Sequence, residues 1–340
     1  MRLTIVTDAW FPQVNGVVHS LNRITTVLRG QGDEVSVVAP DRFRTVPCPT
    51  YPDIRLSLVG PGRIARVIDA EKPDHVHIAT EGPLGMLARR HCLKTGIGFT
   101  TSYHTRFPEY VSARFPLPES WAYAVVRRFH NSGLGCMVAT PSLEAELTAR
   151  GFRHLMRWSR GVDADLFHPR PEANLDLPRP IFLNVGRVAV EKNLEAFCAL
   201  NLPGSRVVVG DGPARAGLQA RFPDVHFLGM MKGEALAQAY ASADVFVFPS
   251  RTDTFGNVLL EALSSGLPVA AFPVTGPRDV ITDPKVGVLD VDLRKAALAA
   301  LELSGADARQ FAQGFSWEAS AAAFRNNILA GHGALAQKAA

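Results

Sequence analysis

The stretch Ser250-Arg-Thr-Asp-Thr-Phe-Gly-Asn-Val-Leu-Leu-Glu261 decides the fold of this chain and marks its candidate site. It follows an apolar run, residues 243–249, that is typical of a buried parallel strand. We expect a helix to begin near Asn257, so that Asp253 and Glu261 flank a strand-to-helix turn. Ligands of open α/β sheets bind at the carboxyl ends of strands, and the unpaired N–H groups of a helix start favour polar ligands. An ordinary strand–helix unit with two solvated acids explains the spacing equally well.

The sequence on both sides of this stretch alternates short apolar segments with amphipathic ones. This alternation predicts an α/β protein with two doubly wound, Rossmann-like parallel sheets facing a cleft. The expected strands are residues 3–7, 34–39, 75–79, 98–102 and 137–140, then 181–185, 206–209, 225–228, 245–248 and 268–271. Helices are expected at residues 17–29, 61–70 and 85–94. Four prolines in residues 169–180 indicate a linker between a first domain, 1–168, and a second, 181–316.

Composition narrows the class of protein. A chain of 340 residues with 47% hydrophobic residues has enough apolar material for two cores. No apolar run reaches the roughly 18 residues of a membrane-spanning helix, and the N-terminus reads as a strand and not as a secretory signal. Four cysteines without paired spacing are expected to be reduced core residues of a cytoplasmic protein, with no metal site.

Charge is unevenly distributed along the chain. Residues 1–165 hold 20 lysines and arginines against 15 acidic residues, whereas the whole chain carries a net charge of +4. This surplus suits phosphates or anionic lipid as partners. It is too small to indicate nucleic acid, and no aromatic-basic module of that kind is present.

Two further segments are suited to binding an anion. Arg187 and Lys192 lie five positions apart in a loop expected to enter a helix, so both can converge on one diphosphate. A solvated loop is the alternative. Asn15-Gly16 follows the first strand and precedes a helix, where backbone N–H groups favour phosphate, but a plain tight turn explains this pair more simply.

Taken in order, these motifs resemble the retaining family-4 glycosyltransferases, which have the GT-B fold. The pair Asp253 and Glu261 is similar to the family's carboxylate-x7-carboxylate signature, with Asp253 in place of the commoner and longer glutamate. Thr252-Asp-Thr-Phe-Gly256 is similar to the branch that contains mannosyltransferases and glycolipid-forming enzymes. The resemblance also implies that a final helix, about 317–330, crosses back onto the first domain.

The resemblance implies a role for each matching residue. His104 would face the transferred sugar, Arg187 and Lys192 would stabilise the leaving diphosphate, and Asp253 would hold sugar hydroxyls; these four are the expected catalytic residues. Glu261 would hold the ribose. The expected donor-binding set is Asn15, Gly16, Arg187, Lys192, Asp211, Asp253, Phe255, Gly256, Asn257 and Glu261. No cofactor is expected, and the lack of an Asp-x-Asp motif beside the expected cleft fits a metal-independent enzyme.

The acceptor side is expected in the first domain. Arg106 would shape it, and the segment 118–129 has Trp121 at the start of an apolar stripe flanked by Arg114, Arg127 and Arg128. A basic amphipathic helix of this kind lies on an anionic membrane, or else packs its apolar stripe into the core with solvated arginines outside. The first alternative predicts a peripheral location on the inner face of the cell membrane.

The function expected is transfer of a hexosyl group, with retention, from a UDP- or GDP-sugar to a membrane lipid such as diacylglycerol. A mannosyltransferase acting on a soluble or polyprenyl-linked saccharide is the alternative. A sugar-nucleotide epimerase, a non-catalytic nucleotide-sugar-binding protein and a NAD-dependent dehydrogenase fit less well. The set of family-like loops argues against an epimerase. The presence of His104, Arg187, Lys192 and Glu261 argues against a non-catalytic binding protein. The absence of a Gly-x-Gly-x-x-Gly context at Gly16 argues against a dehydrogenase.

Overall fold

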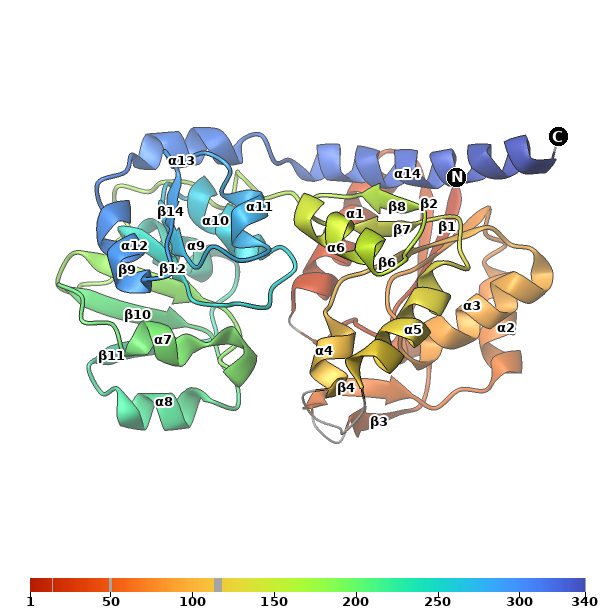
Figure 1. Cartoon of the computed structure of the whole chain (residues 1–340), viewed down its shortest axis with the longest axis horizontal. Coiled ribbons are helices and arrows are strands. Elements are labelled where there is room, and N and C mark those ends of the chain that lie inside the picture. The colour runs from red at the N-terminus through yellow and green to blue at the C-terminus, as the bar shows by residue number, and fades with distance from the viewer. Residues whose placement is uncertain (14, 49–50, 113–117, 340) are drawn as a thin grey trace. The chain divides into compact units, whose positions relative to one another are not determined.

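The computed structural model describes residues 1–13, 15–48, 51–112 and 118–339. Its contacts divide the chain into two compact units, Met1–Ser159 with Trp317–Ala340, and Arg160–Ser316. We call them unit 1 and unit 2 (Figure 1). Residues 160–180 therefore lie with unit 2, whereas the sequence places the domain boundary at 168 and a linker over 169–180. Residues 171–180 form neither helix nor strand, but Ser205 Oγ donates to the carbonyl of Pro178 and ties them to unit 2.

Unit 1 is built on a six-stranded, wholly parallel sheet. Its strand order is β2 (Glu34–Val38), β1 (Arg2–Val6), β5 (His75–Ile78), β6 (Phe99–Ser102), β7 (Cys136–Val138) and β8 (Leu155–Arg157). The first five strands are those expected. β8 is unexpected because it is short and only partly buried, so it carries no apolar run that the sequence could reveal.

Helices cover both faces of this sheet. On one face pack α2 (Pro61–Ala70), α3 (Pro83–Thr95) and α5 (Glu119–His130). On the other pack α1 (Gly16–Gly30) and α14 (Trp317–Ala339). Unit 1 also contains η1 (Pro40–Arg42), the antiparallel pair β3 (Thr45–Cys48) and β4 (Tyr51–Ser57), α4 (Phe107–Ser112) and α6 (Pro141–Ala149).

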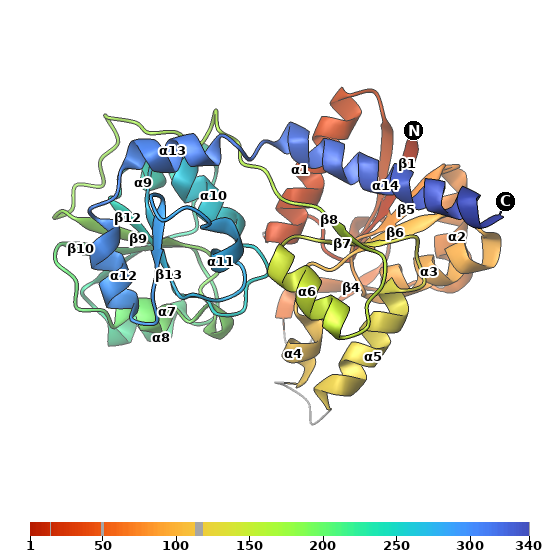
Figure 2. The same cartoon turned by 45° about the horizontal axis from the view of Figure 1, so that its top comes forward.

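The C-terminal helix α14 lies beside α1 (Figure 2). Trp317, Phe324 and Ile328 enter the core that contains Leu3 and Ile5 of β1. Trp158 Nε1 donates to Ser320 Oγ at 3.1 Å and fixes the start of the helix. The helix runs to Ala339, beyond the end near residue 330 that the resemblance implied.

Unit 2 repeats the architecture. Its parallel strand order is β11 (Val225–Gly229), β10 (Ser205–Val209), β9 (Ile181–Val185), β12 (Val245–Phe248), β13 (Val269–Ala271) and β14 (Gly287–Leu289). The central strands β9 and β12 are wholly buried, as their continuous apolar sequences predict. The helices are η2 (Val190–Lys192), α7 (Leu194–Cys198), α8 (Arg215–Arg221), α9 (Gly233–Ala241), α10 (Asn257–Ser264), α11 (Pro277–Val280), α12 (Leu293–Ala300) and α13 (Gly305–Ala312).

Candidate functional site

Two loops at the carboxyl edge of the unit 2 sheet are bound to each other. We call them the donor loops: residues 186–193 after β9 and residues 249–256 after β12. Asn193 has φ of 53° and donates from its amide to the carbonyl of Pro249 at 3.0 Å. Thr252 Oγ1 donates to the carbonyl of Glu191 at 3.3 Å. Because β9 and β12 are adjacent in the sheet, these bonds hold the polar side chains of both loops in one place.

The donor loops bring Lys192 and Asp253 into an ion pair. Both side chains are partly buried, at 29% and 18% exposure, so the pair is shielded from water more than a surface pair would be. Asp253 Oδ2 is buried and has no hydrogen-bond partner among the described residues. Arg187 Nη1 lies 3.8 Å from Glu191 Oε1. Each cation expected to meet the diphosphate therefore has an acid beside it.

The turn between β12 and α10 depends on glycine. Gly256 has φ of 87°, and a side chain there would meet Phe248 and Leu259 at 3.2 Å. Only glycine fits this left-handed, crowded position readily. Phe255 is buried beside it, and Asn257 is the first residue of α10. Because Gly256 offers no side-chain cap, a ligand can accept hydrogen bonds from the start of α10.

Glu261 of α10 receives a hydrogen bond from a residue that the sequence did not indicate. The hydroxyl of Tyr240, at the end of α9, donates to Glu261 Oε2 at 2.9 Å. Burial raises the pKa of Glu261 to about 7, although the Tyr240 hydrogen bond acts in the opposite direction. Tyr240 is an ordinary apolar position in the pattern of α9, so no sequence signal distinguishes it from a core residue.

Asp211 has contacts that a turn alone explains. One of its oxygens accepts from the N–H of Gly212 at 2.7 Å, and the other pairs with Arg215 at 3.1 Å. Gly210 is needed because a side chain there would lie 1.8 Å from the carbonyl oxygen of Gly186. The segment 210–212 therefore packs the β10 loop against the first donor loop.

The expected residues of unit 1 do not form one cluster of free side chains. Asn15 caps α1, accepting from the N–H groups of Val17 and Val18 at 3.0 Å each, and Gly16 is the first helical residue. The side-chain amide oxygen of Asn15 is therefore already used to cap the first turn of α1. His104 lies at the carboxyl edge of the sheet, with its ring centroid 5.7 Å from that of Trp158.

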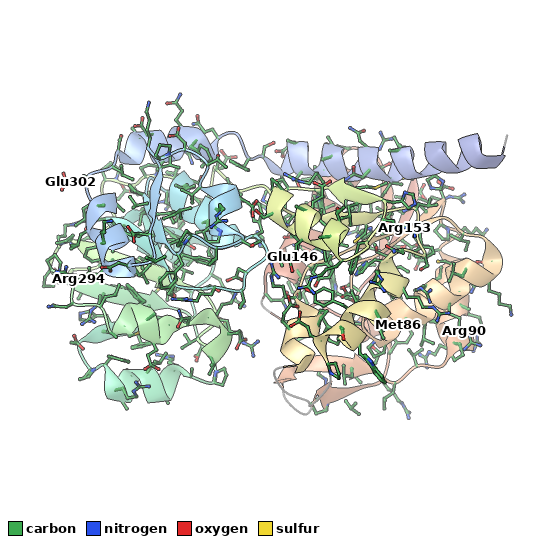
Figure 3. The ribbon with its side chains drawn as sticks, viewed as in Figure 1. Met86, Arg90, Glu146, Arg153, Arg294 and Glu302 are labelled. Atoms are coloured by element: carbon green, nitrogen blue, oxygen red, sulfur yellow. The ribbon has the colours of Figure 1, made fainter. Side chains whose placement is uncertain are left out.

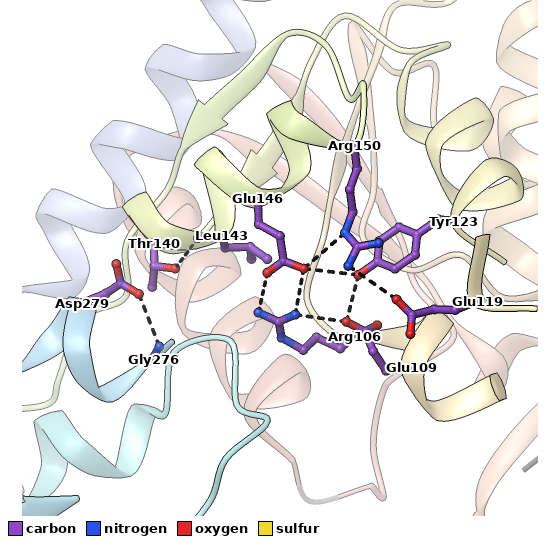
Figure 4. Close-up of polar contacts among 10 residues, drawn as sticks. All are labelled: Arg106, Glu109, Glu119, Tyr123, Thr140, Leu143, Glu146, Arg150, Gly276 and Asp279. Atoms are coloured by element: carbon purple, nitrogen blue, oxygen red, sulfur yellow. Dashed lines mark hydrogen bonds and ion pairs between the residues drawn. The ribbon is translucent and has the colours of Figure 1, made fainter. Parts of the chain in front are cut away.

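Arg106 belongs to an ion network that joins α4, α5 and α6 (Figure 4). Its guanidinium contacts Glu146 Oε2 at 2.8 Å and Glu109 Oε1 at 3.0 Å. Tyr123 donates to the same Glu109 oxygen at 2.8 Å, and the Arg150 guanidinium lies over its ring at 3.8 Å. With two carboxylates bound, Arg106 holds these helices together.

The amphipathic segment forms α5, and its apolar stripe is divided. Trp121 and Val125 are 71% and 58% exposed, whereas Phe129 is 2% exposed and lies in the core. Arg128 is exposed on the same helix, and Arg127 donates to the carbonyl of Arg150 at 2.9 Å. The expectation of one continuous stripe from Trp121 to Phe129 was wrong, because Tyr123 and Val126 supply the buried face instead. Arg114 lies outside the described residues.

Helix α3 contacts the chain at the end of α5. Arg89 of α3 donates to Ser132 Oγ, just beyond α5, at 2.6 Å. Met86, Arg90 and Leu93 are exposed on α3, and Figure 3 labels the first two. No helix within the described residues is long and apolar enough to cross a membrane. No group of three or more metal-binding side chains occurs among them either.

Comparison with known proteins settles the family. Residues 14–166 match the family described as Glycosyltransferase Family 4, and residues 179–304 match Glycosyl transferases group 1. A GDP-mannose-dependent alpha-mannosyltransferase of Mycobacterium tuberculosis is 34% identical over 315 residues, covering 85% of this chain and 83% of that protein. The chain belongs to the family-4 glycosyltransferases. It is therefore a member of a family of retaining hexosyltransferases that use nucleotide-sugar donors.

This glycosyltransferase is also similar to other curated proteins and to solved structures. Sulfoquinovosyl transferase SQD2 of Arabidopsis thaliana is 32% identical, covering 93% of this chain and 71% of that protein. An alpha-monoglucosyldiacylglycerol synthase of Streptococcus pneumoniae is 26% identical, covering 88% and 78%. Among solved structures, a sucrose-phosphate synthase from Thermosynechococcus elongatus has a TM-score of 0.76 at 21% identity, covering 95% of this chain and 97% of that chain. Anabaena HepE in complex with UDP-glucose has a TM-score of 0.68 at 14% identity, covering 96% and 99%. These likenesses show that the glycosyltransferase has the GT-B fold.

Proposed function

We propose that the donor loops and α10 bind the nucleoside diphosphate-sugar from three sides. Arg187 and Lys192 hold the diphosphate, and Asp253 with the backbone at Gly256 holds the sugar. Glu261 holds the ribose hydroxyls. The observation that supports this proposal is the pair of hydrogen bonds between the two donor loops, together with the Lys192–Asp253 ion pair that joins them.

The reaction then needs little beyond electrostatics. As the bond between sugar and diphosphate breaks, negative charge grows on the leaving phosphate, and fixed cations lower the energy of that transition state. The leaving phosphate accepts the proton of the acceptor hydroxyl on the same face of the sugar, which gives retention. His104 of unit 1 remains our proposal for a contact to the transferred sugar.

The acceptor we propose is a membrane lipid with a free hydroxyl, such as diacylglycerol. Trp121 and Val125 are exposed on α5 with Arg127 and Arg128, and Met86, Arg90 and Leu93 are exposed on α3. Exposed apolar side chains among arginines suit the interface of an anionic bilayer. The alpha-monoglucosyldiacylglycerol synthase among the relatives supports a lipid acceptor.

A second candidate is mannosyl transfer to a soluble or polyprenyl-linked saccharide. The similarity to the GDP-mannose-dependent alpha-mannosyltransferase favours it, because that relative is more similar than the glucolipid synthase. The two candidates differ in the donor base, the sugar and the acceptor.

A two-stage screen tests them. Hydrolysis of UDP-, GDP- and ADP-sugars without an acceptor identifies the donor. Transfer from that donor is then measured to diacylglycerol in phosphatidylglycerol vesicles and, separately, to soluble mannosides. Sugar recovered in the lipid fraction supports the first proposal, and transfer only to the soluble mannosides supports the second. Rapid donor isomerisation without transfer contradicts both.

A further inference from the structure

Tyr240 is a buried polar residue in unit 2 whose hydroxyl meets a single described partner. The side chain is 0% exposed. Its ring packs edge-on against Phe167 at a centroid distance of 5.6 Å and tilted against Phe246 at 5.8 Å. With the ring held between these neighbours, the hydroxyl donates to Glu261 Oε2 at 2.9 Å.

We infer that Tyr240 is a positioning residue for donor binding: its fixed hydroxyl holds one oxygen of Glu261 and leaves the other for the ribose. The inference rests on the proposed role of Glu261. It explains why a phenol lies in an otherwise apolar core, where a phenylalanine would fill the same space without needing a partner.

The chemistry of the pair makes the hydroxyl a constant donor. Burial, followed by the charge of Glu261, raises the pKa of Tyr240 well above 10, so the phenol keeps its proton at every physiological pH. Glu261 behaves differently, because burial brings its pKa to about 7. A phenolic hydrogen bond favours the ionised carboxylate, which is the form that accepts best from two ribose hydroxyls. Tyr240 therefore orients Glu261 and also keeps a larger share of it ionised near neutral pH.

The variant that isolates this effect is Tyr240→Phe, which keeps the ring and removes only the hydroxyl. Loss of the hydrogen bond is expected to move the Glu261 titration upward by about one pH unit. Binding of UDP or GDP is then about 5-fold weaker at pH 7, as the ionised fraction of Glu261 falls, and returns toward the wild-type value by pH 8.5. Pyrophosphate, which has no ribose, binds wild type and variant equally.

The experiment is calorimetry with UDP, GDP and pyrophosphate from pH 6 to 8.5 on wild type, Tyr240→Phe, Glu261→Gln and the double variant. The inference requires that Tyr240→Phe adds nothing in the Glu261→Gln background. An equal loss in both backgrounds and at every pH overturns it, as does wild-type binding by Tyr240→Phe. Unchanged nucleotide binding by Glu261→Gln instead rejects the ribose role of Glu261.

A carbon-13 titration of the Glu261 carboxyl without ligand distinguishes a failure of the Tyr240 inference from a failure of the ribose role of Glu261. It measures the coupling between Tyr240 and Glu261 and does not depend on nucleotide binding. We expect an upward-moved midpoint in Tyr240→Phe. In wild type alone, the Tyr240 ring carbon that bears oxygen should shift with the midpoint of Glu261, which keeps the test available even if the variant does not fold. Independent midpoints contradict the coupling.

Discussion

At the residue scale, each cation of the donor loops lies beside an acid. Lys192 contacts Asp253, and Arg187 lies near Glu191. A diphosphate must compete with Asp253 for Lys192. As a consequence, Asp253 is expected to weaken the binding of a nucleoside diphosphate and to support the transfer of its sugar from the whole donor.

This competition predicts that Asp253→Asn binds UDP or GDP about 3–10-fold more tightly, since Lys192 is released, while sugar transfer falls. The size of this change in affinity follows from the small free energy that a partly exposed ion pair contributes. Calorimetry measures the affinity and labelled donor measures transfer. Glu195→Gln is the matched control, because that acid is exposed and pairs with Arg221. Affinity that is unchanged or weaker in Asp253→Asn would show that the pair does not restrain Lys192.

Arg187 and Lys192 should act on the chemical step. Replacing either with alanine is expected to lower turnover by roughly 10²–10³-fold at saturating donor, the scale of losing one transition-state stabiliser. Arg221→Ala removes an exposed cation of the same unit and should leave turnover unchanged. Wild-type rates in both site variants would exclude the proposed roles.

At the scale of elements, the sequence predicted five of the six strands in each parallel sheet and missed the last strand of each. β9 and β12 are fully buried, and their first and last residues were predicted correctly. β8 and β14 have three residues each and were missed. The division of α5 into an exposed Trp121 and a buried Phe129 was not predictable either, because a helix with several apolar residues offers more than one buried face.

The site shows the same division. Asp253 and Glu261 were predicted as site residues from their spacing of eight positions together with the resemblance to the family-4 signature. The Lys192–Asp253 contact joins two loops 61 positions apart, and the Tyr240–Glu261 bond joins two helices, so only the folded chain reveals them.

Helix α14 adds a pH dependence to unit 1. His75 of β5 shares a hydrogen bond with His332 of α14 at 2.9 Å, and its other ring nitrogen meets Thr100 Oγ1. Burial, then the charges of His332 and His77, lowers the pKa of His75 well below 6.5. The unfolded chain therefore binds more protons below pH 6.5, so stability is full above that pH and falls as the solution becomes more acidic.

Thermal unfolding from pH 7.5 to 5 tests this dependence. His75→Gln should melt at a lower temperature than wild type at pH 7.5, and the difference between the two melting temperatures should shrink as the pH falls to 5, because the variant lacks the contribution of His75. His168→Gln is the control, because that histidine lies in unit 2 and its Nδ1 contacts only the carbonyl of Asp165 among described partners. Parallel slopes for wild type and His75→Gln would contradict the argument.

At the scale of the whole molecule, the exposed surface of α5 predicts reversible attachment to anionic vesicles. Arg127 and Arg128 contribute about 2 kcal/mol to the binding free energy near such a surface, and Trp121 adds an interfacial anchor. Salt should weaken attachment as it screens the arginines.

Flotation with phosphatidylglycerol vesicles measures this attachment. The variant Trp121→Ser/Arg127→Ser/Arg128→Ser should remain at the bottom of the gradient, and the control Val291→Ser/Arg294→Ser, also exposed but in unit 2, should float with wild type. If wild type does not bind anionic vesicles at low salt, membrane attachment is excluded and a soluble saccharide acceptor is favoured.

The most direct test of the donor site is a crystal structure of the glycosyltransferase with the nucleoside diphosphate that binds best. We predict the diphosphate against Arg187 and Lys192, with the Lys192–Asp253 pair opened. The ribose hydroxyls should meet Glu261 while Tyr240 still holds its other oxygen. A diphosphate bound with the Lys192–Asp253 pair intact, or a ribose away from Glu261, would contradict the account.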